Sequence, residues 1–338
     1  TIVVIILLAV AIGGYIGYGY YNKIYGKNIK IEQETILYIP TGTDYNGLLF
    51  ILTEQGIIEN IEDFKWVAQQ KDFNKVRPGK YKLSSDIASN NDLVNFLRSA
   101  PQEPVMVTIN NIRKLEQVPG KIAPYFEMDS IAFAQVILNE DVHSKYGFTS
   151  ERFLTMFITN TYQFYWNTTP EEFLVRMADE YKKFWNDDRK AKAAKLNLSQ
   201  SDVSVLASIV QEEQNKFADE RPMIAGVYVN RIKRGMALEA DPTLKFAWND
   251  FSIKRVLNKH KEILSPYNTY KVNGLPPGPI CLPEISSIDA VLNYENHDYI
   301  FMCAKDDLSG YHSFAKTNAQ HEQNARRYQQ KLNELGIK

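Results

Sequence analysis

Glu213 stands at the end of an apolar helical stripe, where a carboxyl group could act as a general acid. Leu206, Ile209 and Val210 follow the i, i+3, i+4 spacing of one helix face. Glu213 comes seven residues after Leu206, and seven steps of about 100° return it to within roughly 20° of the same direction. Burial beside apolar side chains raises the pKa of a carboxyl group. A carboxyl group that keeps its proton near neutral pH can donate it to a reacting bond.

The same segment has a simpler interpretation, in which Glu212 and Glu213 form a solvated pair at a fraying helix end. Glutamates at helix ends are common and usually structural, and Glu212 points to one side of the stripe. The rest of the chain is therefore needed to choose between the two interpretations.

Polar residues downstream of Glu213 are set in tight turns that suit a binding cleft. Asp241-Pro242-Thr243 can cap the helix that follows it, and Tyr267-Asn268-Thr269-Tyr270 leads into Gly274-Leu-Pro-Pro-Gly-Pro279. Gly and Pro at this density exclude regular structure and fix one loop shape. Such a loop, carrying Asn, Thr and Tyr, could line a cleft for hydroxyl and amide groups. An ordinary connector is the alternative.

Composition limits the classes of protein to which the chain can belong. Its 338 residues indicate two or more folding units, and a 44% share of hydrophobic residues is enough for a packed core. The formal net charge of −1 gives no basic surface for nucleic acid. Cys281 and Cys303 do not form a disulfide framework, and whether they pair is open; no Cys/His cluster has zinc spacing. We predict neither a metal nor a cofactor.

Residues 1–22 are predicted to be a transmembrane anchor. Ile2 to Tyr21 contains no charge and is long enough to cross a bilayer core, with tyrosines clustered at one end. A cleaved signal peptide is the alternative, since Ala9-Val10-Ala11 resembles a cleavage site, but the apolar run continues beyond it. The lysines that follow do not settle the orientation.

The remaining chain is predicted to form two α+β units. In the smaller, 28–104, we expect strands at 35–40 and from 79, and helices at 45–55, 60–71 and 89–98. It carries no chemical motif, so a binding module and a spacer are equally open. In the larger, 105–338, we expect a strand at 105–109, helical segments at 114–138 broken at Pro119-Gly120 and Pro124, and one helix at 169–195. A central helix capped by Ser199 or Ser201, a helix at 220–235, strands at 298–304 and 311–315, and a closing helix at 317–335 complete this domain.

Histidines within these elements are expected to be structural, with one exception. Residues His143, His260, His297 and His321 lack a partner motif, whereas His312 and Phe314 point to the same face of a predicted strand.

The chain resembles the YceG-like family of membrane-anchored endolytic murein transglycosylases. The matching pieces, in order, are Leu206-Ala-Ser-Ile-Val-Gln-Glu-Glu213, Glu220-Arg221, Val227-Tyr-Val-Asn230-Arg231, Gly235-Met236 with Leu238, Asp241-Pro-Thr243, Tyr267-Asn-Thr-Tyr270, Gly274-Leu-Pro-Pro-Gly278, and His312-Ser-Phe314 with Thr317 and His321. The resemblance extends over nearly the whole chain, more weakly before about residue 150, where it implies that unit 28–104 is LysM-like.

The resemblance implies that Glu213 is the catalytic acid. The family's preceding glutamate falls on Gln211, Glu212 occupies a position that is typically Lys, and Thr159-Asn160-Thr161-Tyr162 replaces a Pro-Asp-Thr-Tyr motif. These departures change local charge and put any role of the last loop in doubt. The substrate-binding residues that we predict are Asn230, Arg231, Asp241, Thr243, Tyr267, Asn268, Thr269, Tyr270, His312 and Phe314.

The implied activity is lytic cleavage of peptidoglycan strands with formation of a 1,6-anhydro end, which terminates glycan elongation. A hydrolytic muramidase, with Asp241 as second carboxylate, and a non-catalytic wall-binding scaffold are the alternatives. The implied location is the inner membrane, single-pass, with the catalytic domain on the periplasmic side. Peptidoglycan strands and, by resemblance only, a peptidoglycan synthase are the implied partners.

Overall fold

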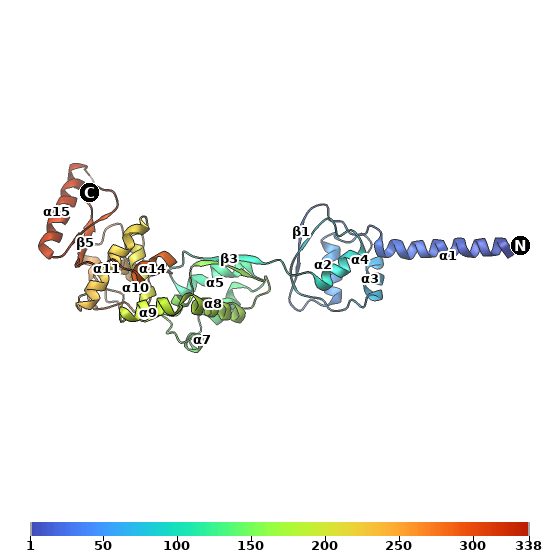
Figure 1. The fold of residues 1–338 in the computed structure, drawn as a ribbon, viewed down its shortest axis with the longest axis horizontal. Coiled ribbons are helices and arrows are strands. Elements are labelled where there is room, and N and C mark those ends of the chain that lie inside the picture. The colour runs from blue at the N-terminus through green and yellow to red at the C-terminus, as the bar shows by residue number, and fades with distance from the viewer. Residues whose placement is uncertain (1, 337–338) are drawn as a thin grey trace. The chain divides into compact units, whose positions relative to one another are not determined.

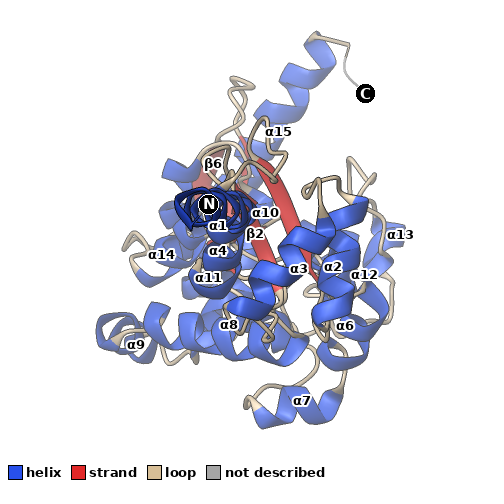
Figure 2. Ribbon diagram, turned by 90° about the vertical axis from the view of Figure 1, so that its right-hand side faces the viewer, coloured by secondary structure: helices blue, strands red, loops and turns tan. Residues whose placement is uncertain are grey.

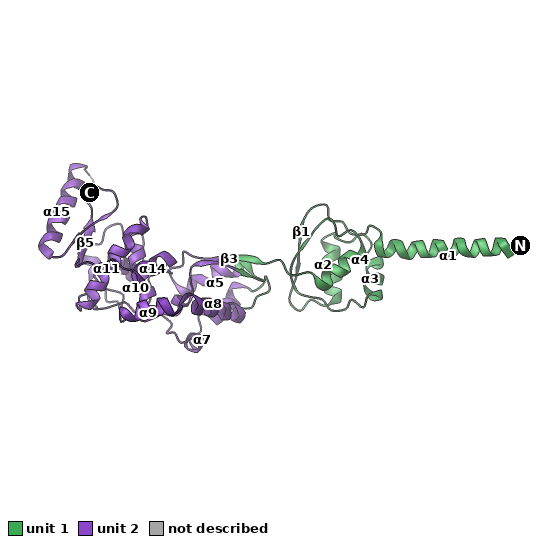
Figure 3. Cartoon of the chain, viewed as in Figure 1, with its two compact units in different colours: residues 1–107, 124–128, 163–169 green, residues 108–123, 129–162, 170–338 purple. Residues whose placement is uncertain are grey.

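A computed structural model describes residues 2–336, and the chain divides into two compact units (Figure 3). Unit 1 contains the chain up to Val107 together with Pro124–Met128 and Gln163–Thr169. Unit 2 contains Thr108–Ala123, Asp129–Tyr162 and the chain from Pro170 onward. The contiguous boundary predicted at 104–105 lies close to the first crossing, but the two short later segments of unit 1 were not foreseen.

The N-terminal helix α1, Ile2–Tyr25, is apolar and its side chains are exposed along nearly the whole length. It is long and apolar enough to cross a membrane by length and composition. It continues three residues beyond the predicted anchor at 1–22, because Lys23 and Ile24 contact the body of unit 1.

Unit 1 is a small α+β unit, as the sequence predicts. Strand β1, Thr35–Ile39, pairs antiparallel with β2, Gly79–Leu83, and between them lie helices α2, Tyr45–Glu54, and α3, Ile61–Gln70; α4, Asn90–Ser99, follows. Alternate strand residues such as Leu37 and Tyr81 face a core that the helices complete. Side chains of Asp44, Asn60 and Ser89 cap the three helices.

The first part of unit 2 contains short helices and one strand pair. Its elements are 3₁₀-helix η1, Leu115–Gln117, α5, Val118–Ile122, η2, Ala123–Tyr125 (shared with unit 1), α6, Ser130–Ile137, α7, Glu140–Lys145, and η3, Phe153–Met156. Strands β3, Val105–Ile109, and β4, Asn160–Phe164, form a two-stranded sheet through which the boundary between the units runs.

Two predictions for this part were wrong. Pro119 does not break a helix, since it lies in the first turn of α5, where proline needs no hydrogen-bond donor. The helix predicted at 169–195 is two helices, α8, Pro170–Phe184, and α9, Asp187–Lys195. Asn186 adopts extended backbone angles and caps α9 through its side chain, while Trp185 is fully buried.

A helical core surrounds the segment that carries Glu213. Helix α10, Gln200–Glu213, packs against α11, Arg221–Lys233, and α14, Ile285–Leu292, and Figure 1 shows the three side by side. Ser199 caps α10, which decides between the two predicted caps. The shorter elements η4, Ala218–Glu220, α12, Asp241–Trp248, and α13, Asn258–Lys261, complete this region.

A hairpin and one long helix end the chain. Strands β5, Phe301–Ala304, and β6, His312–Ala315, pair antiparallel, and α15, Asn318–Glu334, contacts both. Figure 2 distinguishes the helices, in blue, from the strands, in red. The predicted strands at 298–304 and 311–315 are confirmed with shorter bounds.

Candidate active site

Glu213 is the last residue of α10 and lines a cavity of about 510 Å³. Helix α11, the turn before α12, Tyr270 and the β5–β6 hairpin supply the other walls. The residues that line it are Glu213, Val227, Tyr228, Arg231, Leu238, Glu239, Asp241, Lys261, Tyr270, Ile300, Phe301, Met302, Cys303, Ala304, His312 and His321. A single acidic helix end is thus brought together with segments almost a hundred residues downstream.

Among the described residues, one donor contacts the carboxyl group of Glu213, namely the hydroxyl of Tyr228. Tyr228 Oη donates to Glu213 Oε1 at 2.6 Å, and Tyr228 itself is buried. Desolvation by the surrounding side chains raises the pKa of Glu213 to about 7, against the lowering effect of the Tyr228 hydrogen bond; the nearby carboxylate of Asp241 raises it further. Glu213 can therefore hold a proton near neutral pH, as the apolar stripe predicted.

Glu212 does not form a solvated pair with Glu213. Its carboxylate lies 2.9 Å from Arg113 Nη1. The guanidinium of Arg113 also lies over the ring of Phe251, 4.3 Å from its centroid. The two glutamates thus have separate environments, and the solvated-pair interpretation does not describe this helix end.

Gln214 ends α10 and holds the turn that follows. Its backbone leaves the helical region, and its side-chain oxygen accepts from the backbone N–H groups of Lys216 and Phe217. Its side-chain nitrogen donates to Glu220 Oε2 at 2.6 Å and to the carbonyl of Gly310 at 3.0 Å. These contacts explain why the helix stops directly after Glu213 and leaves its carboxyl group at the cavity.

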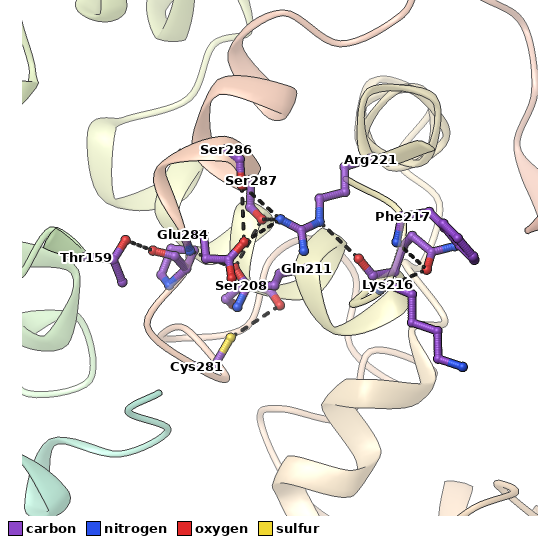
Figure 4. Close-up of polar contacts among 12 residues, drawn as sticks. Thr159, Ser208, Gln211, Lys216, Phe217, Arg221, Cys281, Glu284, Ser286 and Ser287 are labelled. Carbon is purple, nitrogen blue, oxygen red and sulfur yellow. Dashed lines mark hydrogen bonds and ion pairs between the residues drawn. The ribbon is translucent and has the colours of Figure 1, made fainter. Parts of the chain in front are cut away.

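Arg221 joins the end of α10 to the start of α14 (Figure 4). The guanidinium is buried; its Nε donates to the carbonyl of Gln214 at 3.0 Å, and its Nη1 donates to Glu284 Oε2 at 2.8 Å. The hydroxyls of Ser286 and Ser287 accept from the same nitrogen. A buried cation with this many acceptors fixes the geometry of both helix ends.

Gln211 accepts hydrogen bonds from the start of α14. It stands at the position where the resemblance places the family's other glutamate. Its Oε1 accepts from the backbone N–H of Glu284 at 2.6 Å and from the hydroxyl of Ser287 at 3.1 Å. Because only its oxygen is used in these bonds, the amide fills the position as an acceptor without placing a second negative charge beside Glu284.

The Gly/Pro-rich loop is fixed against the other side of α10. Ser208 Oγ accepts from the backbone N–H of Ile280 at 3.0 Å, and Thr159 donates to the carbonyl of Pro283 at 3.0 Å, as Figure 4 shows in part. A Cβ at Gly278 would collide with the backbone of Glu151, so only glycine fits there. The loop predicted to be rigid therefore supports α10, and Thr159 contributes to that support.

Asp241 and Tyr270 form a second polar group in the cavity. Tyr270 Oη donates to Asp241 Oδ1 at 2.5 Å, and the ammonium of Lys261 lies 4.3 Å from the centroid of the Tyr270 ring. Burial and the adjacent carboxylate raise the pKa of Tyr270. The sequence predicts that Asp241 caps α12, but this prediction is wrong. The carboxylate of Asp241 points to Tyr270, and Ala240 is the residue before the helix.

Five of the predicted site residues line the cavity: Glu213, Arg231, Asp241, Tyr270 and His312. The donors of Arg231 are used within the protein, by the carbonyls of Ile300 and Leu238 and by the carboxylate of Glu239. Arg231 therefore holds the hairpin to α11 as one wall of the cavity. His312 is held by Glu220, whose carboxylate accepts from both its backbone N–H and its Nδ1.

The other six do not line the cavity. Thr243, Asn268 and Thr269 are buried, and their side chains hydrogen-bond to backbone groups. Asn230 donates to the carbonyls of His297 and Tyr299. Tyr267 and Phe314 pack in the helical core, and Tyr267 lines a separate, smaller cavity. The side chains of these six residues hold the loop and the hairpin.

Sequence analysis missed Tyr228, Glu239, Lys261, Cys303 and His321 as cavity residues. Tyr228 could have been found, because a tyrosine on a buried helix stripe needs a partner for its hydroxyl. The sequence predicts a structural role for His321; the structure places it at the cavity, where its ring stacks on Phe301 and its buried Nδ1 has no hydrogen-bond partner among the described residues. No local pattern marks Glu239 or Lys261.

Within residues 2–336, no group of three or more His, Cys, Asp or Glu side chains is arranged so that it could hold a metal ion. The two cysteines are free; Cys281 is buried, and burial raises the pKa of its thiol.

Comparisons with known proteins place the chain among similar sequences and a similar fold. A model of the YceG-like family matches residues 37–327. The chain is 27% identical to an endolytic murein transglycosylase of Bacillus subtilis (strain 168), over 92% of this chain and 91% of that protein. It is 25% identical to an endolytic murein transglycosylase of Streptococcus pneumoniae (strain R6), over 97% of this chain but 65% of that longer protein.

The fold is also found in a solved structure. The crystal structure of a YceG-like protein from Listeria monocytogenes matches with a TM-score of 0.57 at 24% identity, covering 87% of this chain and 99% of that one. Because the family model extends from β1 into α15 and so includes both units and the cavity, this chain belongs to the YceG-like family.

Proposed function

We propose that this protein is an endolytic lytic transglycosylase that cleaves the β-1,4 bond between N-acetylmuramic acid and N-acetylglucosamine in peptidoglycan strands. The observation that carries the proposal is the environment of Glu213, a desolvated carboxyl group at a cavity wall with one donor and a pKa raised to about 7. Relatives named endolytic murein transglycosylases align over almost the entire chain.

Glu213 acts first as the general acid. Its proton passes to the glycosidic oxygen while the bond from C1 of the muramoyl residue to that oxygen breaks, and N-acetylglucosamine leaves with a free 4-hydroxyl. Positive charge develops at C1, where the substrate's own acetamide group can stabilise it. The hydrogen bond from Tyr228 orients the carboxyl group, so that one oxygen remains for the substrate.

Glu213 then acts as the base. The carboxylate takes the proton of the muramoyl 6-hydroxyl, whose oxygen attacks C1 and closes the 1,6-anhydro ring. Water is not consumed, and the proton that Glu213 lost is restored. An attack within one sugar residue needs no second reactant to be positioned, which replaces a bimolecular step with an internal one.

Cavity residues beside Glu213 are assigned to substrate binding. Asp241, Tyr270 and Lys261 form a linked polar group that fits sugar hydroxyl and amide groups. His312, in β6, and His321, in α15, also line the cavity. Because the donors of Arg231 are used within the protein, its role is to shape the wall.

Hydrolysis is the second candidate, favoured by the presence of Asp241 in the same cavity. Two carboxylates could serve as acid and base for attack by water. The short hydrogen bond from Tyr270 occupies one oxygen of Asp241 and argues for a positioning role instead. A non-catalytic scaffold is disfavoured, because a binding protein gains nothing from a desolvated carboxyl group without full hydrogen bonding.

Location and partners are inferred from the same activity. The apolar helix α1 serves as a membrane anchor, and a peptidoglycan substrate places the catalytic unit on the periplasmic side of the inner membrane. We assign a LysM-like role to unit 1 on the basis of its α+β content and the family resemblance. Release of strands at an anhydro end ends their elongation, which makes a peptidoglycan synthase the expected partner.

Mass spectrometry of the products tests the reaction. Uncrosslinked glycan strands are incubated with the wild type and with Glu213→Gln. Internal fragments with anhydro ends from the wild type alone support the proposal. Reducing ends, each heavier by one water, support hydrolysis and overturn it.

Asp241→Asn is the matched variant that separates the two reactions. A hydrolase that needs Asp241 as base loses activity with it, whereas a lytic enzyme keeps forming anhydro ends with altered KM. Strands that bind but are not cut by either wild type or variant would favour the scaffold.

A further inference from the structure

The last turn of α1 is built into unit 1 without a linker. The helix runs unbroken from the charge-free segment to Tyr25. Asn90 Nδ2 donates to the carbonyl of Lys23 at 2.9 Å, and Lys23 Nζ lies 2.9 Å from Asp63 Oδ1. Ile24 packs against the core of the unit. Because three residues of helix rise about 4.5 Å, the body of unit 1 begins within about 5 Å of the end of the charge-free segment.

The segment after α1 is held by the first residues of two helices. Asn28 Nδ2 donates to the carbonyl of Asn60 at 2.9 Å and to Asn90 Oδ1 at 2.7 Å, and its Oδ1 accepts from the backbone N–H of Asn60 at 2.7 Å. Asn60 caps α3, and Asn90 is the first residue of α4. These buried hydrogen bonds fix the direction in which α1 leaves the unit.

Helix α3 lies across the end of unit 1 from which α1 emerges. Figure 1 places α3 at that end, and Figure 2, in which α1 is seen end-on, shows α3 extended in the plane of the view. Phe64, Val67 and Ala68 face the core, whereas Glu62 and Gln69 are exposed and Trp66 is half-buried. The helix therefore has one face in the unit and one face directed away from the core.

The level of Trp66 relative to the bilayer follows from its contact with α1. The ring of Trp66 stacks on that of Tyr20, with centroids 5.2 Å apart and an interplanar angle of 26°. Tyr20 lies within the charge-free run that ends at Tyr21, and twenty helical residues span about 30 Å, the thickness of a bilayer core. If this run crosses the bilayer, Tyr20 lies at its edge, and Trp66 lies at the same level, where tryptophan and tyrosine are favoured.

Most charges on this end of unit 1 are paired, whereas the exposed Lys27, two residues after α1, has no ion pair among the described residues. Lys65 lies 2.7 Å from Glu62, and Lys23 pairs with Asp63. A single unpaired lysine attracts anionic lipids only weakly, so the apolar and aromatic groups must provide most of the contact.

We propose that α3 and the ring of Trp66 are seated in the headgroup region of the bilayer that holds α1, so that anchor and unit 1 form one rigid membrane-bound piece. This proposal rests on the membrane anchor proposed above. Its partner is the lipid surface itself, independent of the sign of the headgroup charge.

Depth-dependent quenching of tryptophan fluorescence tests the proposal. The full chain is reconstituted in zwitterionic vesicles that carry a nitroxide either near the lipid carbonyls or at the end of the acyl chain. We expect the shallow quencher to act more strongly than the deep one, and this difference to be lost in Trp66→Phe. Trp248→Phe, which removes an exposed tryptophan of unit 2, is the matched control and keeps the difference. A shallow component unchanged in Trp66→Phe overturns the proposal.

A second variant tests rigidity. About six Gly and Ser residues inserted between Tyr21 and Asn22 separate Tyr20 from unit 1 while keeping Lys23 with it. We expect the variant to float with the vesicles and to lose the shallow quenching of Trp66. Quenching that survives the insertion contradicts a rigid seat. A wild type that fails to float refutes the anchor and with it the seat, whereas the catalytic proposal is judged separately from the masses of the cleaved ends.

Discussion

Two glutamates seven residues apart, Glu213 and Glu220, lie on either side of the turn that ends α10, and their surroundings differ in the number of donors. Glu213 accepts one hydrogen bond, from Tyr228, and faces the cavity. Glu220 is buried, and its two oxygens accept from Gln214 Nε2, from the backbone N–H of His312 and from His312 Nδ1. The hydrogen bonding of the Glu213 carboxyl group is therefore incomplete, whereas that of the Glu220 carboxyl group is complete.

The difference separates a reactive carboxyl group from a structural one. A buried carboxylate with few donors is unstable as an anion, and its pKa rises, which suits proton transfer. A carboxylate with several donors joins the elements that carry them, and here Glu220 joins β6 to the end of α10. Burial alone therefore does not identify a catalytic residue; incomplete hydrogen bonding at a cavity does.

Replacing Glu213 by Gln is expected to have the largest effect of any change near this turn. The amide keeps the shape but cannot donate or accept the transferred proton, so the rate of strand cleavage should fall by about 10²- to 10⁴-fold. The rate is measured from the appearance of anhydro ends. Circular dichroism should show an unchanged fold, and activity within tenfold of the wild type would refute the assignment.

Glu220→Gln is expected to affect stability more than chemistry. The substitution replaces one carboxylate oxygen by an NH₂ group, which cannot accept from the donors of Gln214 and His312. A buried donor left without an acceptor lowers the free energy of unfolding by about 1–3 kcal/mol. We expect a lower melting temperature of the full chain in detergent and a smaller loss of cleavage rate than in Glu213→Gln. A variant with the melting temperature of the wild type but no activity would show that Glu220 acts in the chemistry and not in stability.

Glu213→Gln should also stabilise the protein, and this effect should depend on pH. The folded-state pKa is raised from the ordinary 4.5 to about 7. Below 4.5 both states of the wild type hold the proton and no cost arises. As the pH rises to 7, the unfolded chain ionises while the folded one does not, so wild-type stability falls by up to about 3 kcal/mol. The variant should therefore melt higher than the wild type at pH 8, and the two should melt alike near pH 4; an equal difference at both would count against the raised pKa.

Local signals were enough to predict most elements and the central residue. The apolar stripe through Leu206 and Val210 predicted the helix and the desolvation of Glu213, and the capping residue Ser199 predicted where that helix starts. The antiparallel strands near the C-terminus were predicted from their composition and the turn between them. The break at Asn186 was missed because a capping asparagine inside a helical pattern looks like an ordinary polar residue.

Much of the cavity wall could not be predicted, because it depends on which side chains of each segment face inward. Asn268 and Thr269 are polar residues in a suitable loop, yet their side chains are used to satisfy nearby backbone groups. Lys261 comes from a segment without any motif, and His321, although it belongs to the family pattern, is expected from the sequence to be structural. Both reach the cavity only through tertiary packing. Sequence patterns predict burial along one element, whereas these contacts depend on several.

Tyr228→Phe tests how finely the single donor adjusts Glu213, and its effect should be the smallest. The hydrogen bond from Tyr228 lowers the pKa of Glu213, so its removal should raise that pKa. Since the free enzyme must carry the proton on Glu213, kcat/KM falls at high pH, and this basic limb should move upward in the variant by less than about one pH unit. The plateau at low pH should fall modestly, because the carboxyl group loses its orienting contact. Tyr270→Phe is the matched control: its hydroxyl binds Asp241, so KM should change while the basic limb moves less. A limb that moves downward in Tyr228→Phe would show that the phenol does not stabilise the anion, and the contrast between Glu213 and Glu220 would then have to rest on burial alone.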